Sequence, residues 1–178
     1  MRTLILKFFK LFYKQMDLSV YYSVKDLIFI FFMQKIIGIN RKVQWPVHYS
    51  TQIKAPENII KQTNKNPGVS QRCYFDARNG IVFGENVWIG PGISIISQNH
   101  LLTNYHKYTK GKPIKIGKNS ILSANCIILS EVELGEHTIV AAGAVVTKSF
   151  LEKNQVLGGN PAKVVKVIGD YSEKKIVI

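Results

Sequence analysis

Branched aliphatic residues recur every six positions through the second half of the chain. A second series, of residues that are smaller on average, follows the lead positions by four residues. The lead positions are Phe83, Ile89 and Ile95 and, after a break, Ile116, Leu122, Ile128, Leu134, Val140 and Val146, and the second series is Val87, Ile93, Ser120, Cys126, Val132, Thr138 and Ala144. A helix repeats every 3.6 residues and a strand every two, so neither produces this spacing. Three short strands joined by tight corners do, which predicts a parallel β-helix.

Ordinary strands of a β-sandwich also alternate in polarity, but none of the nine lead positions is polar or charged, which favours the coil. We expect each lead side chain to point inward and to stack on its equivalent eighteen residues later. Glycine follows the lead residue at four places, Gly84, Gly90, Gly117 and Gly135. Because glycine adopts conformations closed to other residues, we expect it to permit the corners there.

The first forty residues are apolar and basic but contain no long apolar run. The most apolar stretch, 27–39, is interrupted by Gln34 and Lys35, so it is too short to span a membrane, and no cleavage site of an export signal is visible. Apolar residues between Leu4 and Phe12 recur at helical spacing, which predicts one or two amphipathic helices with basic polar faces. Such helices pack on the protein or on a neighbouring subunit, or lie on an anionic membrane, and both possibilities stay open.

The open ends of a stacked coil need covering. We therefore divide the chain into a helical and extended capping segment (1–66), the repeat (67–149), and a carboxy-terminal cap and tail (150–178). Residues 45–66, with two prolines and several asparagines, are expected to form extended chain and loops.

One large insertion interrupts the repeat. After Ile95 the lead series resumes only at Ile116, which leaves fifteen extra residues and predicts a loop at about 97–113. Insertions at the corners of a solenoid often form its binding face. This one is rich in polar and aromatic side chains, among them Asn99, His100, Asn104, Tyr105 and His106. His100 lies at the root, where the coil fixes its backbone, so it is favoured for chemistry over the remaining histidines His48, His106 and His137.

Composition narrows the classes of partner. Twenty-four Lys and Arg against eleven Asp and Glu leave a net charge of +13, which suits an anionic ligand. The excess is spread over both halves of the chain, which argues against a nucleic-acid-binding arm. The two cysteines, Cys73 and Cys126, have no disulfide-scaffold or metal-site spacing. We expect a cytoplasmic protein without metal, with residues 1–40 open to peripheral contact with the inner face of the membrane.

Several motifs together resemble the hexapeptide-repeat acyltransferases, in particular the sugar and polysaccharide O-acetyltransferases. The resemblance covers roughly residues 67–168. The motifs are the segments Phe83–Pro91, Asn99–His100, Ile116–Asn119, Ala142–Lys148 and Gly159–Lys163. The resemblance implies a left-handed β-helix, a homotrimer with active sites between subunits, and acetyl-coenzyme A as donor. Where relatives often carry an aspartate after the Asn-His pair, this chain has Leu101.

The resemblance also implies roles for individual residues. His100 is the expected general base, since a sugar hydroxyl needs a base beside it to attack a thioester and neutral imidazole suits that task. The donor is expected to contact Ala124, Ala142, Thr147, Lys148, Lys163 and Lys166, and the acceptor Asn99, Asn104, Tyr105 and His106. Both cysteines are expected to pack in the core rather than act as nucleophiles.

Three functions remain as alternatives. The leading hypothesis is O-acetylation of a sugar in a surface polysaccharide or its precursor. The second is N-acetylation of an amino sugar nucleotide. The third is a noncatalytic β-helix that serves as a scaffold at a membrane surface.

Overall fold

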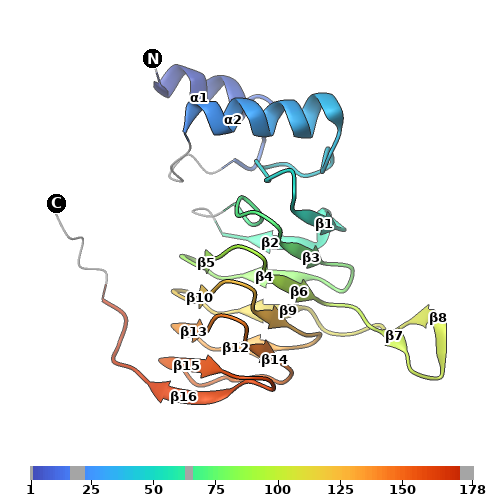
Figure 1. The fold of residues 1–178 in the computed structure, drawn as a ribbon, viewed down its shortest axis with the longest axis vertical. Coiled ribbons are helices and arrows are strands. Elements are labelled where there is room, and N and C mark those ends of the chain that lie inside the picture. The colour runs from blue at the N-terminus through green and yellow to red at the C-terminus, as the bar shows by residue number, and fades with distance from the viewer. Residues whose placement is uncertain (1, 17–22, 63–65, 173–178) are drawn as a thin grey trace.

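Two helices lie across one end of a coil of short strands (Figure 1). The computed structural model describes residues 2–16, 23–62 and 66–172 of the 178-residue chain. Helix α1 spans Arg2–Lys10 and α2 spans Val24–Phe31, and a π-helical turn over Phe32–Ile37 follows. No described helix is both long and apolar enough to cross a membrane.

The coil is built from three sheets that run its length. The first contains β1 (Gln52–Lys54), β3 (Tyr74–Asp76), β6 (Ser94–Ile96), β11 (Ile127–Ile128) and β14 (Val145–Val146). The second contains β2 (Ile59–Lys61), β4 (Ile81–Phe83), β9 (Ile114–Ile116) and β12 (Glu133–Leu134). The third contains β5 (Trp88–Ile89), β10 (Ile121–Leu122), β13 (Thr138–Val140) and β15 (Gln155–Gly158), to which β16 (Lys163–Val167) adds antiparallel. The other strand pairs of these sheets are parallel, which confirms the predicted parallel β-helix.

The register of the strands explains the six-residue period. Lead residues pair with the lead residue of the next coil, as Leu122 does with Val140 and Ile128 with Val146. Eight of the nine lead side chains are at most 2% exposed, and the remaining one, Ile89, packs against the same core. The second series is buried as well. The period is therefore the spacing at which side chains enter one continuous core.

The glycines that follow the lead residues have a different role from the one expected. They do not adopt positive φ; the corners turn two residues later, at Asn86, Asn119 and His137, with φ between 52° and 59°. Glycine is required because the next coil lies directly against it. A Cβ on Gly117 would lie 2.6 Å from the backbone nitrogen of Glu136, which is closer than real Cβ contacts. The corner interpretation of these glycines was wrong, since close stacking of backbones is what excludes a side chain.

The coil also begins upstream of residue 67, within the segment expected to be loops. Strands β1 and β2 pair in parallel with β3 and β4 and form a first coil. Val47, Ile53 and Ile59 recur at the six-residue spacing and are all buried. Each of these strands is only three residues long, and the prolines and asparagines around them are typical of loops. The sequence therefore favoured loops here.

The helices have their own small core and a polar joint to the coil. Phe9, Tyr13, Met16 and Leu27 form a cluster separate from the coil core. Buried Gln34 links the two parts: its Nε2 donates to the carbonyls of Asn40, Val43 and Trp45 at 3.0–3.2 Å, and its Oε1 accepts from the Val47 N–H at 3.1 Å. This amide fixes where the chain enters the coil.

Candidate active site

The inserted segment forms a hairpin that projects from the side of the coil (Figure 1). Strands β7 (His100–Leu101) and β8 (Asn104–Tyr108) pair antiparallel, with His100 opposite Tyr108. Phe83 pairs with Ile116 across the insertion, so the coil continues in register on either side of it. The residues of both hairpin strands are exposed, whereas the coil around them is buried. The hairpin is an addition to the coil that leaves its stacking intact.

The His100 ring is oriented by the hairpin itself. Its Nδ1 lies 2.5 Å from the backbone carbonyl oxygen of Tyr105. A carbonyl only accepts hydrogen bonds, so Nδ1 carries the proton and the lone pair of the neutral ring is on Nε2. The ring also packs on the Tyr108 ring, with 4.6 Å between centroids. The Tyr105 carbonyl and the Tyr108 ring therefore orient the imidazole, a role that could not be assigned from the sequence. Nε2 is left as a proton acceptor.

An ion pair between a buried carboxylate and a partly exposed guanidinium supports the hairpin at its root. The Asp76 carboxylate accepts hydrogen bonds from the Arg78 guanidinium at 2.9 and 2.6 Å, and its side chain is 2% exposed. The guanidinium carbon lies 4.7 Å from the Tyr108 ring centroid. Burial alone raises the pKa of Asp76, but the hydrogen bonds and charge of Arg78 lower it overall, so the carboxylate stays ionised. Asp76, Arg78, Tyr108 and His100 thus form a continuous chain of contacts.

The role of this ion pair cannot be read from the sequence. Asp76 ends strand β3 and Arg78 follows two residues later, a pattern that carries no signal without the knowledge that the hairpin folds over it. Asn79 adds a second support, since its Nδ2 donates to the carbonyls of Ser97 and Thr109, one in each stem of the hairpin. These three residues hold the insertion at a fixed place.

The predicted acceptor residues lie along the hairpin. Asn99 Nδ2 donates to Ser130 Oγ at 2.8 Å, which ties the root to the next coil. Asn104 Oδ1 accepts from the His106 N–H at 3.0 Å and shapes the turn, while the Tyr105 side chain is exposed. The structure thus brings the Tyr105 carbonyl to His100, with Asn99 next to it in sequence, and leaves His106 exposed in the middle of β8.

The predicted donor residues are divided between the two ends of the strands of the first sheet and strand β16 of the third sheet. Ala124 and Ala142 stack at the corner that precedes β11 and β14, where the Gly143 N–H donates to the Ala124 carbonyl at 3.0 Å. Thr147 and Lys148 follow β14, at the end of the strands from which the hairpin leaves. Lys163 and Lys166 are exposed on β16 in the third sheet. One chain therefore does not gather all the predicted donor contacts beside His100.

Two other histidines make local structural contacts. His48 Nδ1 lies 2.8 Å from Ser50 Oγ, and His137 Nδ1 lies 2.8 Å from Asn154 Oδ1. Ser50 is two residues after His48, and Asn154 is in the coil that follows His137. Neither contact involves a residue of the hairpin.

Both cysteines are buried and poorly suited to act as nucleophiles. Cys126 is fully buried in the second inward series, and burial raises the pKa of its thiol to about 12. Burial also raises the pKa of Cys73. Since the thiolate is the reactive form, neither side chain is activated at neutral pH. Among the described residues, no three His, Cys, Asp or Glu side chains gather in a way that could hold a metal ion.

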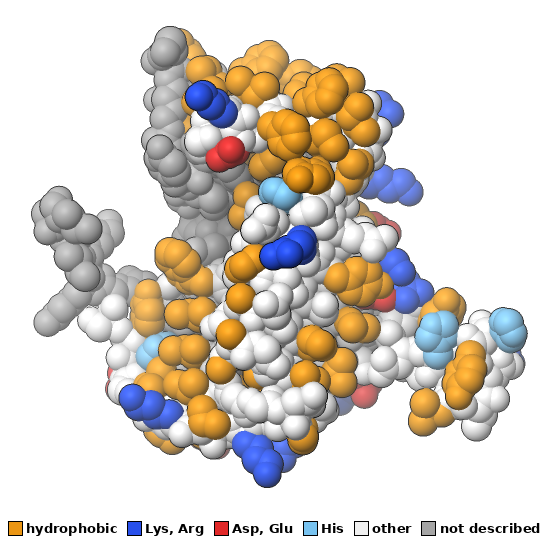
Figure 2. Space-filling model, in the orientation of Figure 1, with side chains coloured by type: hydrophobic (Ala, Val, Ile, Leu, Met, Phe, Trp, Pro, Cys, Tyr) orange, Lys and Arg blue, Asp and Glu red, His pale blue; other side chains and the backbone are white. Residues whose placement is uncertain are grey.

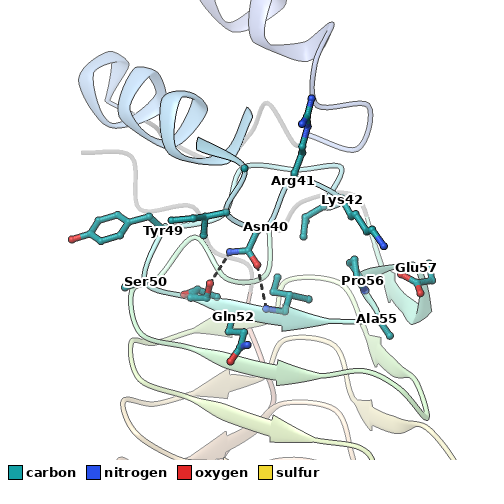
Figure 3. A pocket seen from close by; sticks show the side chains of 14 residues that line it. Asn40, Arg41, Lys42, Tyr49, Ser50, Gln52, Ala55, Pro56 and Glu57 are labelled. Carbon is teal, nitrogen blue, oxygen red and sulfur yellow. Dashed lines mark hydrogen bonds between the residues drawn. The ribbon is translucent and has the colours of Figure 1, made fainter. Parts of the chain in front are cut away.

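A hollow of about 890 Å³ lies away from this site, where residues 38–43 meet strand β1 (Figure 3). Asn40 points from it to β1: its Nδ2 donates to the Thr51 carbonyl at 2.6 Å and its Oδ1 accepts from the Ile53 N–H at 3.3 Å. The amide therefore pairs with the edge of the first strand as a backbone would. The lining contains no histidine or cysteine and none of the predicted site residues.

Comparison with known proteins agrees with the repeat. The bacterial transferase hexapeptide model (six repeats) matches residues 113–148. A Staphylococcus aureus (strain Mu50) protein, named as a candidate acetyltransferase, is 32% identical over 147 residues, which cover 81% of this chain and 69% of that protein. The chain belongs to the hexapeptide-repeat acetyltransferases.

Solved structures of hexapeptide-repeat acyltransferases share the fold. A galactoside acetyltransferase in complex with coenzyme A matches with a TM-score of 0.53 at 22% identity, covering 68% of this chain and 64% of that one. A mutant N-acyltransferase from Bacillus cereus, in complex with an amino sugar nucleotide and coenzyme A, matches with a TM-score of 0.55 at 19% identity, covering 70% and 81%. The coil is accordingly the left-handed parallel β-helix of these acetyltransferases.

Proposed function

We propose that this protein transfers an acetyl group from acetyl-coenzyme A to a hydroxyl of a sugar in a surface polysaccharide or its precursor, with His100 as the general base. The hydrogen bond from His100 Nδ1 to the Tyr105 carbonyl carries the proposal, because it fixes the tautomer in which Nε2 accepts a proton. Family membership and the coenzyme A complexes of two structural neighbours support the choice of donor.

The reaction is direct transfer. His100 Nε2 removes the proton of the sugar hydroxyl as its oxygen attacks the thioester carbonyl. A backbone N–H at a coil corner stabilises the oxyanion. When the C–S bond breaks, the imidazolium returns the proton to the coenzyme A thiolate. The buried cysteines favour this route over an acyl-enzyme intermediate.

The donor site follows from the predicted residues. Ala124 and Ala142 offer a corner without large side chains for the pantetheine, and Thr147 lies at the other end of β14. Lys148, Lys163 and Lys166 supply positive charge for the phosphates. Only Thr147 and Lys148 follow β14 at the corner from which the hairpin leaves, and the other predicted donor residues lie elsewhere on the chain. A complete site therefore requires a neighbouring copy, and we propose a homotrimer. Sedimentation should give a trimer; a fully active monomer would contradict this arrangement.

N-acetylation of an amino sugar nucleotide is the second candidate, favoured by the ligands of the Bacillus cereus neighbour. One assay separates the two. A panel of sugars and amino sugar nucleotides is incubated with labelled acetyl-coenzyme A, and the product is exposed to mild base, which removes O-acetyl but not N-acetyl groups. We expect a base-labile product. A base-stable product would establish N-acetylation instead, and binding of acetyl-coenzyme A without any transfer or hydrolysis would favour a noncatalytic scaffold.

A further inference from the structure

The amino-terminal helices carry more apolar surface than their packing uses. Phe9 of α1, and Tyr13 and Met16 in the segment that follows it, are buried against α2. A second set of large apolar side chains on the helices and the turn after them is 36–76% exposed: Leu4, Phe8, Leu11, Phe12, Ile28, Phe29, Phe32, Ile36, Ile37 and Ile39. Figure 2 shows hydrophobic side chains gathered over the helical end of the molecule. We name this set the helical apolar face.

The spacing of these residues makes the face continuous. Leu4, Phe8 and Leu11 follow one another at the intervals of a single helix face, and Phe12 lies beside them. Phe12 packs on Phe31 of α2 with 5.0 Å between ring centroids, so the faces of the two helices adjoin. A helix that only covers the coil needs one apolar face. Here a second one is exposed, which is typical of a surface that is buried by a partner.

Basic side chains surround the helical apolar face. Lys7 and Lys10 of α1, and Lys14 after it, are exposed and lie in the same segment as Leu4, Phe8 and Leu11. Lys25 lies one turn before Ile28 on α2, and Arg41 and Lys42 follow the helices. Asp26 is the single acidic residue in the described part of residues 2–42. An apolar face bordered by lysines is the arrangement of helices that lie in the interface of an anionic bilayer.

We propose that the helical apolar face docks on an anionic membrane surface, with its aromatic and aliphatic side chains at the acyl boundary and its lysines on the lipid phosphates. The charge argues against a second copy of this chain as the occupant, because copies packed on this face would bring like charges together. Each lysine near an anionic surface adds about 1 kcal/mol of attraction, or roughly fivefold in affinity. The inference does not depend on the proposed chemistry, and its test does not use activity.

Flotation of the full chain with vesicles tests the proposal. Vesicles of equal parts phosphatidylglycerol and phosphatidylcholine are compared with pure phosphatidylcholine. The parent protein should float with the anionic vesicles and lose most of this binding at high salt. The double variant Phe8→Ser/Leu11→Ser should bind at least tenfold more weakly, because two apolar groups no longer enter the bilayer. Val165→Ser, an exposed apolar position on β16, should bind like the parent.

A second variant controls for a folding defect in the first. Lys7→Gln/Lys10→Gln changes only exposed side chains and should weaken binding to the anionic vesicles by about tenfold or more while leaving the melting temperature unchanged. Parent protein that ignores both kinds of vesicle would overturn the proposal. So would a Phe8→Ser/Leu11→Ser variant that keeps its vesicle binding but loses its oligomeric state, since the face would then be a subunit contact.

Discussion

The coil and the hairpin that interrupts it use their residues in opposite ways. In the coil, the apolar side chains of the two inward series enter one core, and most strands have only two or three residues because each stacks on the next. In the hairpin, every residue of β7 and β8 is exposed, and its position depends on a few polar contacts at its root. The coil therefore provides stability and the hairpin provides exposed chemistry at a fixed place. Substitutions in the two regions should separate these properties.

Removal of a core side chain should have the largest effect on stability. Leu122 is fully buried and stacks on Val140, so Leu122→Ala should lower the free energy of unfolding by about 2–5 kcal/mol. Leu102→Ala, at an 87% exposed position in the hairpin turn, should change it by less than about 0.5 kcal/mol. Chemical denaturation measures both. Equal losses would mean that the hairpin contributes to the core.

Stacking of the coils should be sensitive to a single methyl group. Gly117→Ala places a Cβ against the backbone of the next coil and should destabilise the protein by about 1–3 kcal/mol. Gly169→Ala is a matched control, since a Cβ there meets nothing within 4 Å. Thermal melts compare the two variants. A fully stable Gly117→Ala protein would show that the coils separate at little cost.

The ion pair at the root of the hairpin should affect catalysis as well as folding. Arg78→Ala removes the cation under Tyr108 and should lower kcat about tenfold, with the KM for acetyl-coenzyme A unchanged, because the His100 ring loses its support. Arg78→Lys should not restore kcat, since an ammonium lacks the planar fork that binds Asp76. Lys115→Ala, at an exposed ion pair on β9, serves as control. An Arg78→Ala enzyme with parental kcat would show that the hairpin positions His100 without the help of Arg78.

The smallest effect concerns pH. The pKa of Asp76 is lower in the folded protein than in the unfolded chain, where it is about 3.9. Its contribution to stability is therefore complete above roughly pH 4 and is lost as the pH falls through the folded value. Denaturation midpoints measured between pH 5 and pH 2 should fall more steeply for the parent than for Asp76→Asn. Parallel curves would exclude a structural role for this ionisation.

The predictable and unpredictable parts of the molecule differ in a physical way. A repeated backbone unit imposes the same burial at the same position in every coil, so the lead series predicted the core and the break at 97–113 predicted the insertion. The first coil was missed because Val47, Ile53 and Ile59 are only three repeats of the signal and lie among prolines and asparagines. The contact of Arg78 with Tyr108 has no period, since it exists only once the hairpin folds back on the coil.

The central claim is that His100 is the base of an acetyl transfer. The most direct measurement is the rate of label transfer from acetyl-coenzyme A at subsaturating acceptor for the parent, His100→Ala and His106→Ala proteins. We predict that His100→Ala keeps its oligomeric state and donor affinity but transfers about two to four orders of magnitude more slowly, while His106→Ala loses much less. A His100→Ala protein that transfers at the parental rate, beside an inactive His106→Ala protein, would contradict the claim and assign the chemistry to His106.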